Sequence, residues 1–296
     1  MLFILLLLYK FKVMTRRQHS EPSHSSRHST ATRLPIRGLA PLSLAIATLL
    51  AVTAVALAGE AGPSPSGQLH RLDWKVKPST AGTMKRPRPA TFEITAIHRT
   101  TTGVKPDAER RALLHFQKGY KLNYALFPKC DRTKLERRGP SACPKGSRVG
   151  TGSAMADATP VVSTPVRATI TAFIGKRKNT YLIYAVPQLG LPVILEGTYR
   201  NVPYGPYGYS LDVSIPLVAT LLGQPPATIV FFRITTGAKT TIKRKTKIGG
   251  KRVTRKATVS LFENPRFCTG SWQFAIEFTY ENGEQLTPTD SVPCTK

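Results

Sequence analysis

Short extended runs separated by glycine and proline constrain the fold of this chain more than any other feature. No run of ten or more residues follows the helical period, whereas stretches such as 91–98 and 271–280 alternate between apolar and polar residues. This spacing is typical of antiparallel all-β proteins rather than of alternating β and α units. The predicted strands are 91–98, 111–116, 166–174, 180–186, 193–200, 209–215, 227–235, 240–248, 253–262, 271–280 and 285–292. We therefore predict an antiparallel β-sandwich over residues 91–296, immunoglobulin-like or jelly-roll-like, as one domain or two subdomains.

The C-terminal hairpin is the clearest supersecondary prediction. The run Ser271–Tyr280 carries its aromatic residues on one face, and Asn282-Gly283 follows it as a strong turn signal. A two-residue loop would place the apolar residues of the returning strand on the polar side. A three-residue loop keeps the apolar faces together and pairs Trp272 with Cys294, so we expect the longer loop.

Four cysteines follow residue 58, namely Cys130, Cys143, Cys268 and Cys294. They permit three pairings. Pairing between neighbours closes two short loops, and the expected hairpin brings the last two cysteines together as a clamp. A zinc site is the alternative, but no CxxC motif is present and only three histidines follow residue 58. We therefore expect two disulfides and an oxidising compartment.

One short helix is predicted inside the first cysteine loop. Asp131 can cap its N-terminus, Leu135 faces inward, and Gly139 ends the helix before Pro140. It is the single helix expected in the domain.

An export signal is predicted at the N-terminal end of the sequence. Leu39–Ala58 is an uncharged apolar run with Arg33 and Arg37 on its N-terminal side, and its small-residue exit at Ala56–Ala58 fits cleavage after Ala58. The same run is long enough to anchor the chain in a membrane if it is not cleaved. Residues 1–58 are thus expected to be an N-terminal extension with a signal peptide. Residues 59–90, rich in Gly, Pro and Ser, are predicted to be a flexible linker.

Basic charge is concentrated in the segment 239–256, in a chain whose formal net charge is +27. Gly249-Gly250 lies in its middle and indicates a hairpin. Such a hairpin projects positive side chains toward anionic polymers, although lysines on an edge hairpin also serve simply to prevent edge-to-edge pairing. The candidate polyanion-binding residues are Lys243, Arg244, Lys245, Lys247, Lys251, Arg252, Arg255 and Lys256.

A tyrosine-rich segment follows the predicted strand 193–200. Tyr199, Tyr204, Tyr207 and Tyr209 are spaced by glycine and proline and form a possible ligand loop, since exposed tyrosines stack on sugar rings. The alternative is that these side chains pack against the sheet.

Catalytic motifs are absent from the sequence. There is no GxSxG, HExxH or P-loop, and Gly150-Thr151-Gly152 lacks the third glycine of a dinucleotide site. Glu196 and Asp212 could form the carboxylate pair of a glycoside hydrolase, but among so many basic residues we expect them to pair with Arg or Lys. His98 and His115 are expected to be half-buried strand positions. We therefore expect no catalytic residue, no metal and no cofactor.

Three stretches carry a resemblance to a group of proteins. They are 127–154, with FPKCDRTKLERRGPSACPKGSRVGTGSA, 205–213, with GPYGYSLDV, and 268–294, which begins CTGSWQFAIEFTYENGE and closes with SVPC. In these stretches the chain resembles secreted, uncharacterised β-rich proteins of high-GC Gram-positive bacteria. The resemblance covers the last 170 to 180 residues or so. It implies an exported, disulfide-bonded β fold with no assigned activity.

Together these features predict a non-enzymatic module that is secreted or extracellular and associated with the cell envelope. Its expected partner is an anionic envelope polymer bound by the basic hairpin. We expect no specific nucleic acid partner, and no membrane contact other than an uncleaved Leu39–Ala58 segment. The alternative is a carbohydrate-binding or carbohydrate-active protein that uses the tyrosine loop.

Overall fold

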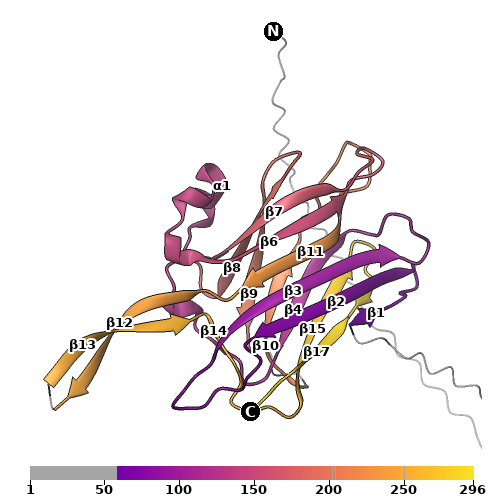
Figure 1. The fold of residues 1–296 in the computed structure, drawn as a ribbon. Helices are drawn as coiled ribbons and strands as arrows, with labels where there is room; N and C mark the ends of the chain where they lie inside the picture. Colours follow the sequence, from indigo (N-terminus) through magenta and orange to yellow (C-terminus); the bar gives the residue numbers. More distant parts are fainter. Residues whose placement is uncertain (1–58, 202, 204, 250) are drawn as a thin grey trace, which may run out of the picture. The chain divides into compact units, whose positions relative to one another are not determined.

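The structure is a computed structural model that describes residues 59–296 apart from 202, 204 and 250 (Figure 1). The predicted signal segment lies outside these residues. The strands are β1 (Glu60–Ala61), β2 (Gln68–Lys77), β3 (Pro89–Thr100), β4 (Glu109–Gln117), β5 (Lys121–Leu122), β6 (Arg148–Asp157), β7 (Val166–Ile174), β8 (Thr180–Pro187), β9 (Val193–Arg200), β10 (Tyr207–Ser214), β11 (Thr228–Thr236), β12 (Lys239–Ile248), β13 (Lys251–Ser260), β14 (Phe262–Glu263), β15 (Ser271–Tyr280), β16 (Gln285–Leu286) and β17 (Thr289–Pro293). The helical segments are η1 (Tyr124–Leu126), α1 (Arg132–Arg138), η2 (Pro140–Ala142) and η3 (Lys145–Ser147). No helix in the described part of the chain is long and apolar enough to cross a membrane.

The strands form one 15-stranded sheet and a separate two-stranded sheet, β12-β13. The large sheet runs β1-β2-β3-β11-β6-β7-β8-β9-β10-β4-β15-β16, with β17 beside β15 and with β14 and β5 attached at β3. Neighbouring strands are antiparallel, which confirms the all-β antiparallel prediction. The predicted sandwich type is not confirmed, because the strands join edge to edge into one barrel-like sheet.

The two ends of this sheet meet, so that the barrel is nearly closed. The backbone N–H of Trp74 on β2 donates to the carboxylate of Asp290 on β17 at 2.6 Å. Beyond both strands, Thr295 exchanges backbone hydrogen bonds with Ser79 and Ala81, at 3.0 and 2.8 Å. These bonds satisfy backbone N–H and C=O groups at the two sheet edges, which could otherwise pair with strands of other chains.

Strand β2 corrects the prediction of a flexible linker at 59–90. Every second residue of β2 faces the interior, and the core members of this face are Leu72, Trp74 and Val76. The Trp74 ring stacks on Phe274 of β15, with 4.4 Å between centroids. The flanking residues are rich in Gly, Pro and Ser, so the whole segment has the composition of a linker although it contains an alternating strand. Only its period of two marks it as structured.

Strand β6 was also absent from the prediction, because its sequence is rich in glycine. A Cβ atom at Gly152 would lie 1.9 Å from the carbonyl oxygen of Arg233 on the neighbouring strand β11. Glycine is therefore required there for the backbones to approach, and it marks a strand rather than a nucleotide-binding loop.

The C-terminal hairpin has the expected three-residue loop, Glu281–Gly283, since the N–H of Tyr280 bonds to the carbonyl of Glu284. Its register differs by two residues from the prediction: Trp272 pairs with Val292 instead of Cys294. A three-residue loop that joins Tyr280 to Glu284 places Trp272 opposite Val292, so the predicted pairing with Cys294 did not follow from the loop length.

Both disulfides join neighbouring cysteines, Cys130 to Cys143 and Cys268 to Cys294, as expected. The helix predicted inside the first loop is α1. Asp131 accepts a hydrogen bond from the N–H of Lys134, the Leu135 side chain is fully buried, and Gly139 ends the helix with φ 69°.

Truncation of Trp74 tests the correction at β2. Trp74→Ala should lower the free energy of unfolding by about 3–5 kcal/mol, because it removes a large buried ring. Arg71→Ala, at an exposed position of the same strand, should change it by less than about 0.5 kcal/mol. Denaturant unfolding measures both. If both variants changed the free energy of unfolding by the same small amount, residues 68–77 would be a flexible linker and not a core strand.

Loss of the second disulfide tests the clamp on the C-terminal hairpin. The pair Cys268→Ser and Cys294→Ser should lower the free energy of unfolding by about 2–4 kcal/mol, because the bridge restricts the unfolded chain. Peptide mapping of the unreduced protein provides the companion measurement. A peptide linking Cys130 to Cys294 would contradict the described pairing.

Candidate functional site

An apolar cavity of about 320 Å³ lies inside one end of the barrel-like sheet. Apart from Glu109 and Thr220, every residue that lines it is apolar. It adjoins a smaller interior cavity of about 90 Å³, and the two share Glu109, Leu195, Ile215, Ile229 and Phe232 in their walls. Together they run from the loops at this end toward the centre of the sheet.

Small side chains on three adjacent strands explain the larger cavity. They are Ala154, Ala156 and Ala158 in and after β6, Ala168 on β7 and Ala185 on β8. Ala154 and Ala168 also lie opposite each other in the register of β6 and β7. Large residues such as Ile170 and Leu195 fill the interior further in. A barrel whose inward residues are small keeps space for a ligand.

Three loops surround the mouth of the cavity and expose apolar side chains. These loops connect β6 to β7, β8 to β9 and β10 to β11, and each contributes lining residues. Leu191 is 84 % exposed, and Leu189 in the same loop is also exposed. Exposed leucines beside an apolar opening are typical of ligand-binding sites rather than of an inert surface.

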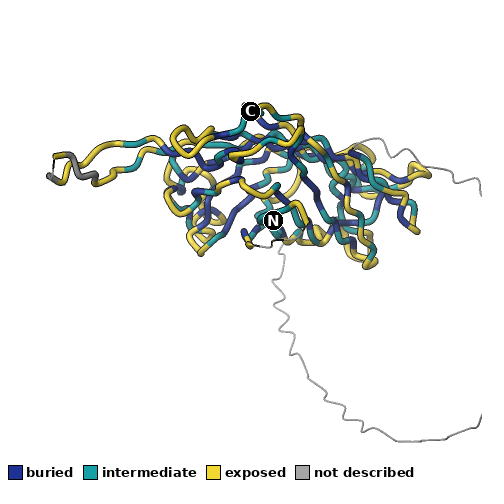
Figure 2. Tube along the Cα trace, turned by 90° about the horizontal axis from the view of Figure 1, so that it is seen from below, coloured by how far each residue is buried: buried dark blue, intermediate teal, exposed yellow. Residues whose placement is uncertain are grey.

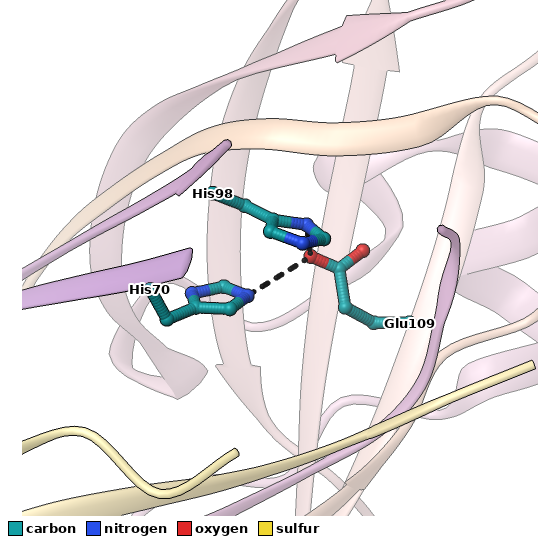
Figure 3. A group of neighbouring side chains, drawn as sticks. All are labelled: His70, His98 and Glu109. Carbon is teal, nitrogen blue, oxygen red and sulfur yellow. Dashed lines mark ion pairs between the residues drawn. The ribbon is translucent and has the colours of Figure 1, made fainter. Parts of the chain in front are cut away.

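A cluster of three buried ionisable residues lines the smaller cavity, and one of them, Glu109, also lines the larger one. Figure 3 shows the three side chains. His70 on β2, His98 on β3 and Glu109 on β4 are each at most 3 % exposed. Glu109 Oε1 lies 2.8 Å from His98 Nδ1 and 3.5 Å from His70 Nε2. Despite these distances, neither nitrogen makes a well-aligned hydrogen bond.

The environment lowers the pKa values of two members of this cluster. Burial lowers the pKa of His70 to about 4, which makes its neutral form the stable one. Burial acts to raise the pKa of Glu109, but its contacts with the two histidines outweigh this and lower the pKa to about 2. The cluster therefore holds a buried carboxylate beside a neutral imidazole.

The His70 ring is held between two aromatic neighbours. It stacks on Phe278 with 3.8 Å between centroids and on His98 with 4.2 Å. The sequence does not predict the cluster, because His70 lies in the predicted linker and because three histidines without a CxxC motif do not form a recognisable zinc-site pattern. The alternation of His70, Leu72, Trp74 and Val76 was the available signal.

The basic hairpin β12-β13 projects away from the large sheet and is mostly exposed (Figure 2). Lys243 pairs with Lys256 and Arg244 with Arg255 across the hairpin, so like charges lie opposite each other. In the described part of the chain no acidic residue forms an ion pair with these four side chains. Two of the predicted polyanion-binding residues, Lys247 and Lys251, lie outside the part of the chain whose side chains the structure describes. The exposed candidates are Lys243, Arg244, Lys245, Arg252, Arg255 and Lys256.

The tyrosine loop is not a set of exposed rings. Tyr199 is 4 % exposed and belongs to the core, and Tyr209 stacks on Phe116 with its hydroxyl buried. Tyr207 stacks on the buried ring of His115 with 5.0 Å between centroids. Tyr204 lies outside the described residues. The alternative expectation, that the tyrosines pack against the sheet, therefore holds for Tyr199 and Tyr209.

The candidate catalytic carboxylates are paired with arginines, as expected. Asp212 bonds to Arg111 at 2.7 Å and lies 3.2 Å from Arg200. Glu196 forms ion pairs with Arg132 and Arg177. Two carboxylates neutralised in this way do not resemble an acid–base pair.

A serine–histidine contact occurs on the outer side of β4. Ser210 Oγ lies 2.8 Å from His115 Nδ1. Ser210 is fully buried, so its hydroxyl cannot reach a substrate as a nucleophile. The contact satisfies two buried polar groups.

Comparisons with known proteins identify no relative of this chain. No protein-family model, curated protein or solved structure matches this chain. The resemblance to secreted proteins of high-GC Gram-positive bacteria therefore stays a prediction, and functional inference depends on the geometry described above.

Proposed function

We propose that this protein binds an apolar small molecule inside its barrel-like sheet and acts outside the cell without catalysing a reaction. The observation that carries the proposal is the apolar cavity of about 320 Å³ with its mouth between three loops. Sites for small molecules typically have volumes of about 300–1,000 Å³ and few polar groups. The two disulfides indicate an oxidising environment, which supports an extracellular role.

The lining favours a ligand that is apolar along most of its length, such as an acyl chain or a terpenoid. Methyl and branched aliphatic groups from Ala156, Ala168 and Leu195 face the cavity and offer no hydrogen bonds. A sugar would leave its hydroxyls unpaired there, at a cost of about 1–3 kcal/mol for each buried group. The apolar lining therefore argues against the carbohydrate alternative. So do the burial of Tyr199 and the stacking of Tyr209 on Phe116.

Binding of a neutral apolar fluorophore tests this function. Titration with N-phenyl-1-naphthylamine should show one saturable site with enhanced fluorescence, and the probe carries no charge that the basic surface could attract. Ala168→Phe should weaken binding by about tenfold or more, because a ring placed in the cavity takes up the ligand's space and a loss of about 1.4 kcal/mol is sufficient.

Thr169→Phe is the matched control, since Thr169 is exposed on the same strand and faces the opposite side of the sheet. It should leave binding unchanged. Near-ultraviolet circular dichroism checks that both variants are folded. A folded Ala168→Phe variant that binds the probe as well as the parent protein would refute the proposal.

We further propose that the β12-β13 hairpin binds an anionic polymer of the cell envelope. What supports this second function is the pairing of like charges across an exposed hairpin, at Lys243 with Lys256 and Arg244 with Arg255. Like charges directly opposite each other destabilise a strand pair, and a bound polyanion would relieve the repulsion. The absence of aromatic residues in the segment argues against stacking on single-stranded nucleic acid.

Charge reversal in the hairpin tests the second function. The changes Lys243→Glu, Lys245→Glu, Arg252→Glu and Arg255→Glu should abolish retention on heparin at moderate salt. All four side chains are exposed, so the fold should be kept. Elution salt concentration is the measurement, because contacts with a polyanion weaken steeply with salt.

The control reverses four exposed lysines elsewhere that have no ion pair in the described structure: Lys85, Lys118, Lys134 and Lys178. It changes the net charge by the same amount. Specific binding predicts that the control variant is still retained. Equal loss in both variants would show attraction by net charge alone.

A further inference from the structure

The amide of Gln68 determines which nitrogen of His98 carries a hydrogen. Gln68 Nε2 donates to Asp107 Oδ2 at 3.1 Å, so the amide oxygen is the atom that faces His98 Nε2, at 2.9 Å. A carbonyl oxygen only accepts hydrogen bonds. His98 Nε2 is therefore the donor, and in the neutral ring the lone pair is on Nδ1.

That lone pair lies against a carboxylate. His98 Nδ1 is 2.8 Å from Glu109 Oε1, and both atoms are electron-rich when the ring is neutral. They attract each other only through a cation between them, either a proton or a metal ion. The nearby His70 ring, 2 % exposed, also has no hydrogen-bond partner for either nitrogen in the described structure. A proton on His98 would leave His70 with only its 3.5 Å contact to Glu109 and no well-aligned hydrogen bond, whereas a metal ion engages all three residues.

We propose that His70, His98 and Glu109 bind a divalent transition-metal ion, with Zn²⁺ as the ion that best fits the donor set. Two imidazoles and one carboxylate suit Zn²⁺ and its first-row neighbours, while Ca²⁺ and Mg²⁺ prefer oxygen ligands throughout. The three ligand atoms lie within 4.8 Å of one another. Atoms bound to one Zn²⁺ lie at most about 4.2 Å apart, so a small rotation of the rings completes the site.

The surroundings of the cluster match those of a metal site. Metal-bound histidines usually donate their other ring N–H to an oxygen that fixes the tautomer, as His98 does to Gln68. Gln68 is in turn held by Asp107, which also accepts from Asn282 at 2.8 Å. Glu109 lines both cavities, so the larger cavity offers an entry path for the ion. This inference does not depend on the binding of an apolar ligand.

Metal titration of the full chain tests the site. After treatment with a chelator and its removal, isothermal titration calorimetry with Zn²⁺ should show one ion bound per chain. Co²⁺ bound in place of Zn²⁺ should show visible d–d absorption bands that are typical of a low coordination number. Glu109→Gln and His98→Gln should each weaken Zn²⁺ binding by more than about 100-fold, and Gln68→Leu by about 10- to 100-fold.

His115→Gln is the matched control, because His115 is a buried histidine outside the cluster, and it should keep full Zn²⁺ affinity. If the cluster variants do not fold, nuclear magnetic resonance of the parent protein tests whether the cluster binds Zn²⁺. With ¹⁵N-labelled histidine, Zn²⁺ should shift the ring signals of His70 and His98 and leave those of His115 unchanged. No saturable Zn²⁺ binding by the parent protein would overturn the proposal. So would a His98 ring protonated on both nitrogens in the presence of Zn²⁺.

Discussion

The enclosed interior of this protein exists because β2 and β17 meet and close the sheet. β2 and β17 meet through the bond from the Trp74 N–H to Asp290, and Thr295 continues the contact to Ser79 and Ala81. Without this junction the sheet would have two open edges and no enclosed interior. The stack of Trp74 on Phe274 adds an aromatic contact between the same two ends of the sheet, and the bridge from Cys268 to Cys294 fixes the hairpin that supplies β17.

Closure also places three strand ends around one buried cluster. His70 and His98 come from the paired strands β2 and β3, while Glu109 comes from β4, which belongs to the other end of the sheet order. The carboxylate reaches the histidines only because the sheet curls. The same curvature encloses the alanine-lined space beside the cluster. Cavity and cluster are therefore two consequences of one topology.

Local patterns in the sequence predicted local structure well. The hairpin loop at Glu281–Gly283, the helix capped by Asp131 and the neighbour pairing of the cysteines all follow from short-range signals. The single closed sheet could not be predicted, because alternation shows which side of a strand is buried but not which strand lies beside it. His70 and Glu109 are 39 residues apart in the sequence and share no motif. Their contact depends on long-range pairing, and so the candidate site was missed.

We propose that the space enclosed by the closed sheet holds an apolar ligand. Nuclear Overhauser effects between bound N-phenyl-1-naphthylamine and labelled methyl groups test it most directly. We expect contacts with the interior methyl groups of Ala154, Ile170 and Leu195, which line the cavity. Contacts confined to the exposed loop residue Leu191, with none to the interior methyl groups, would contradict it.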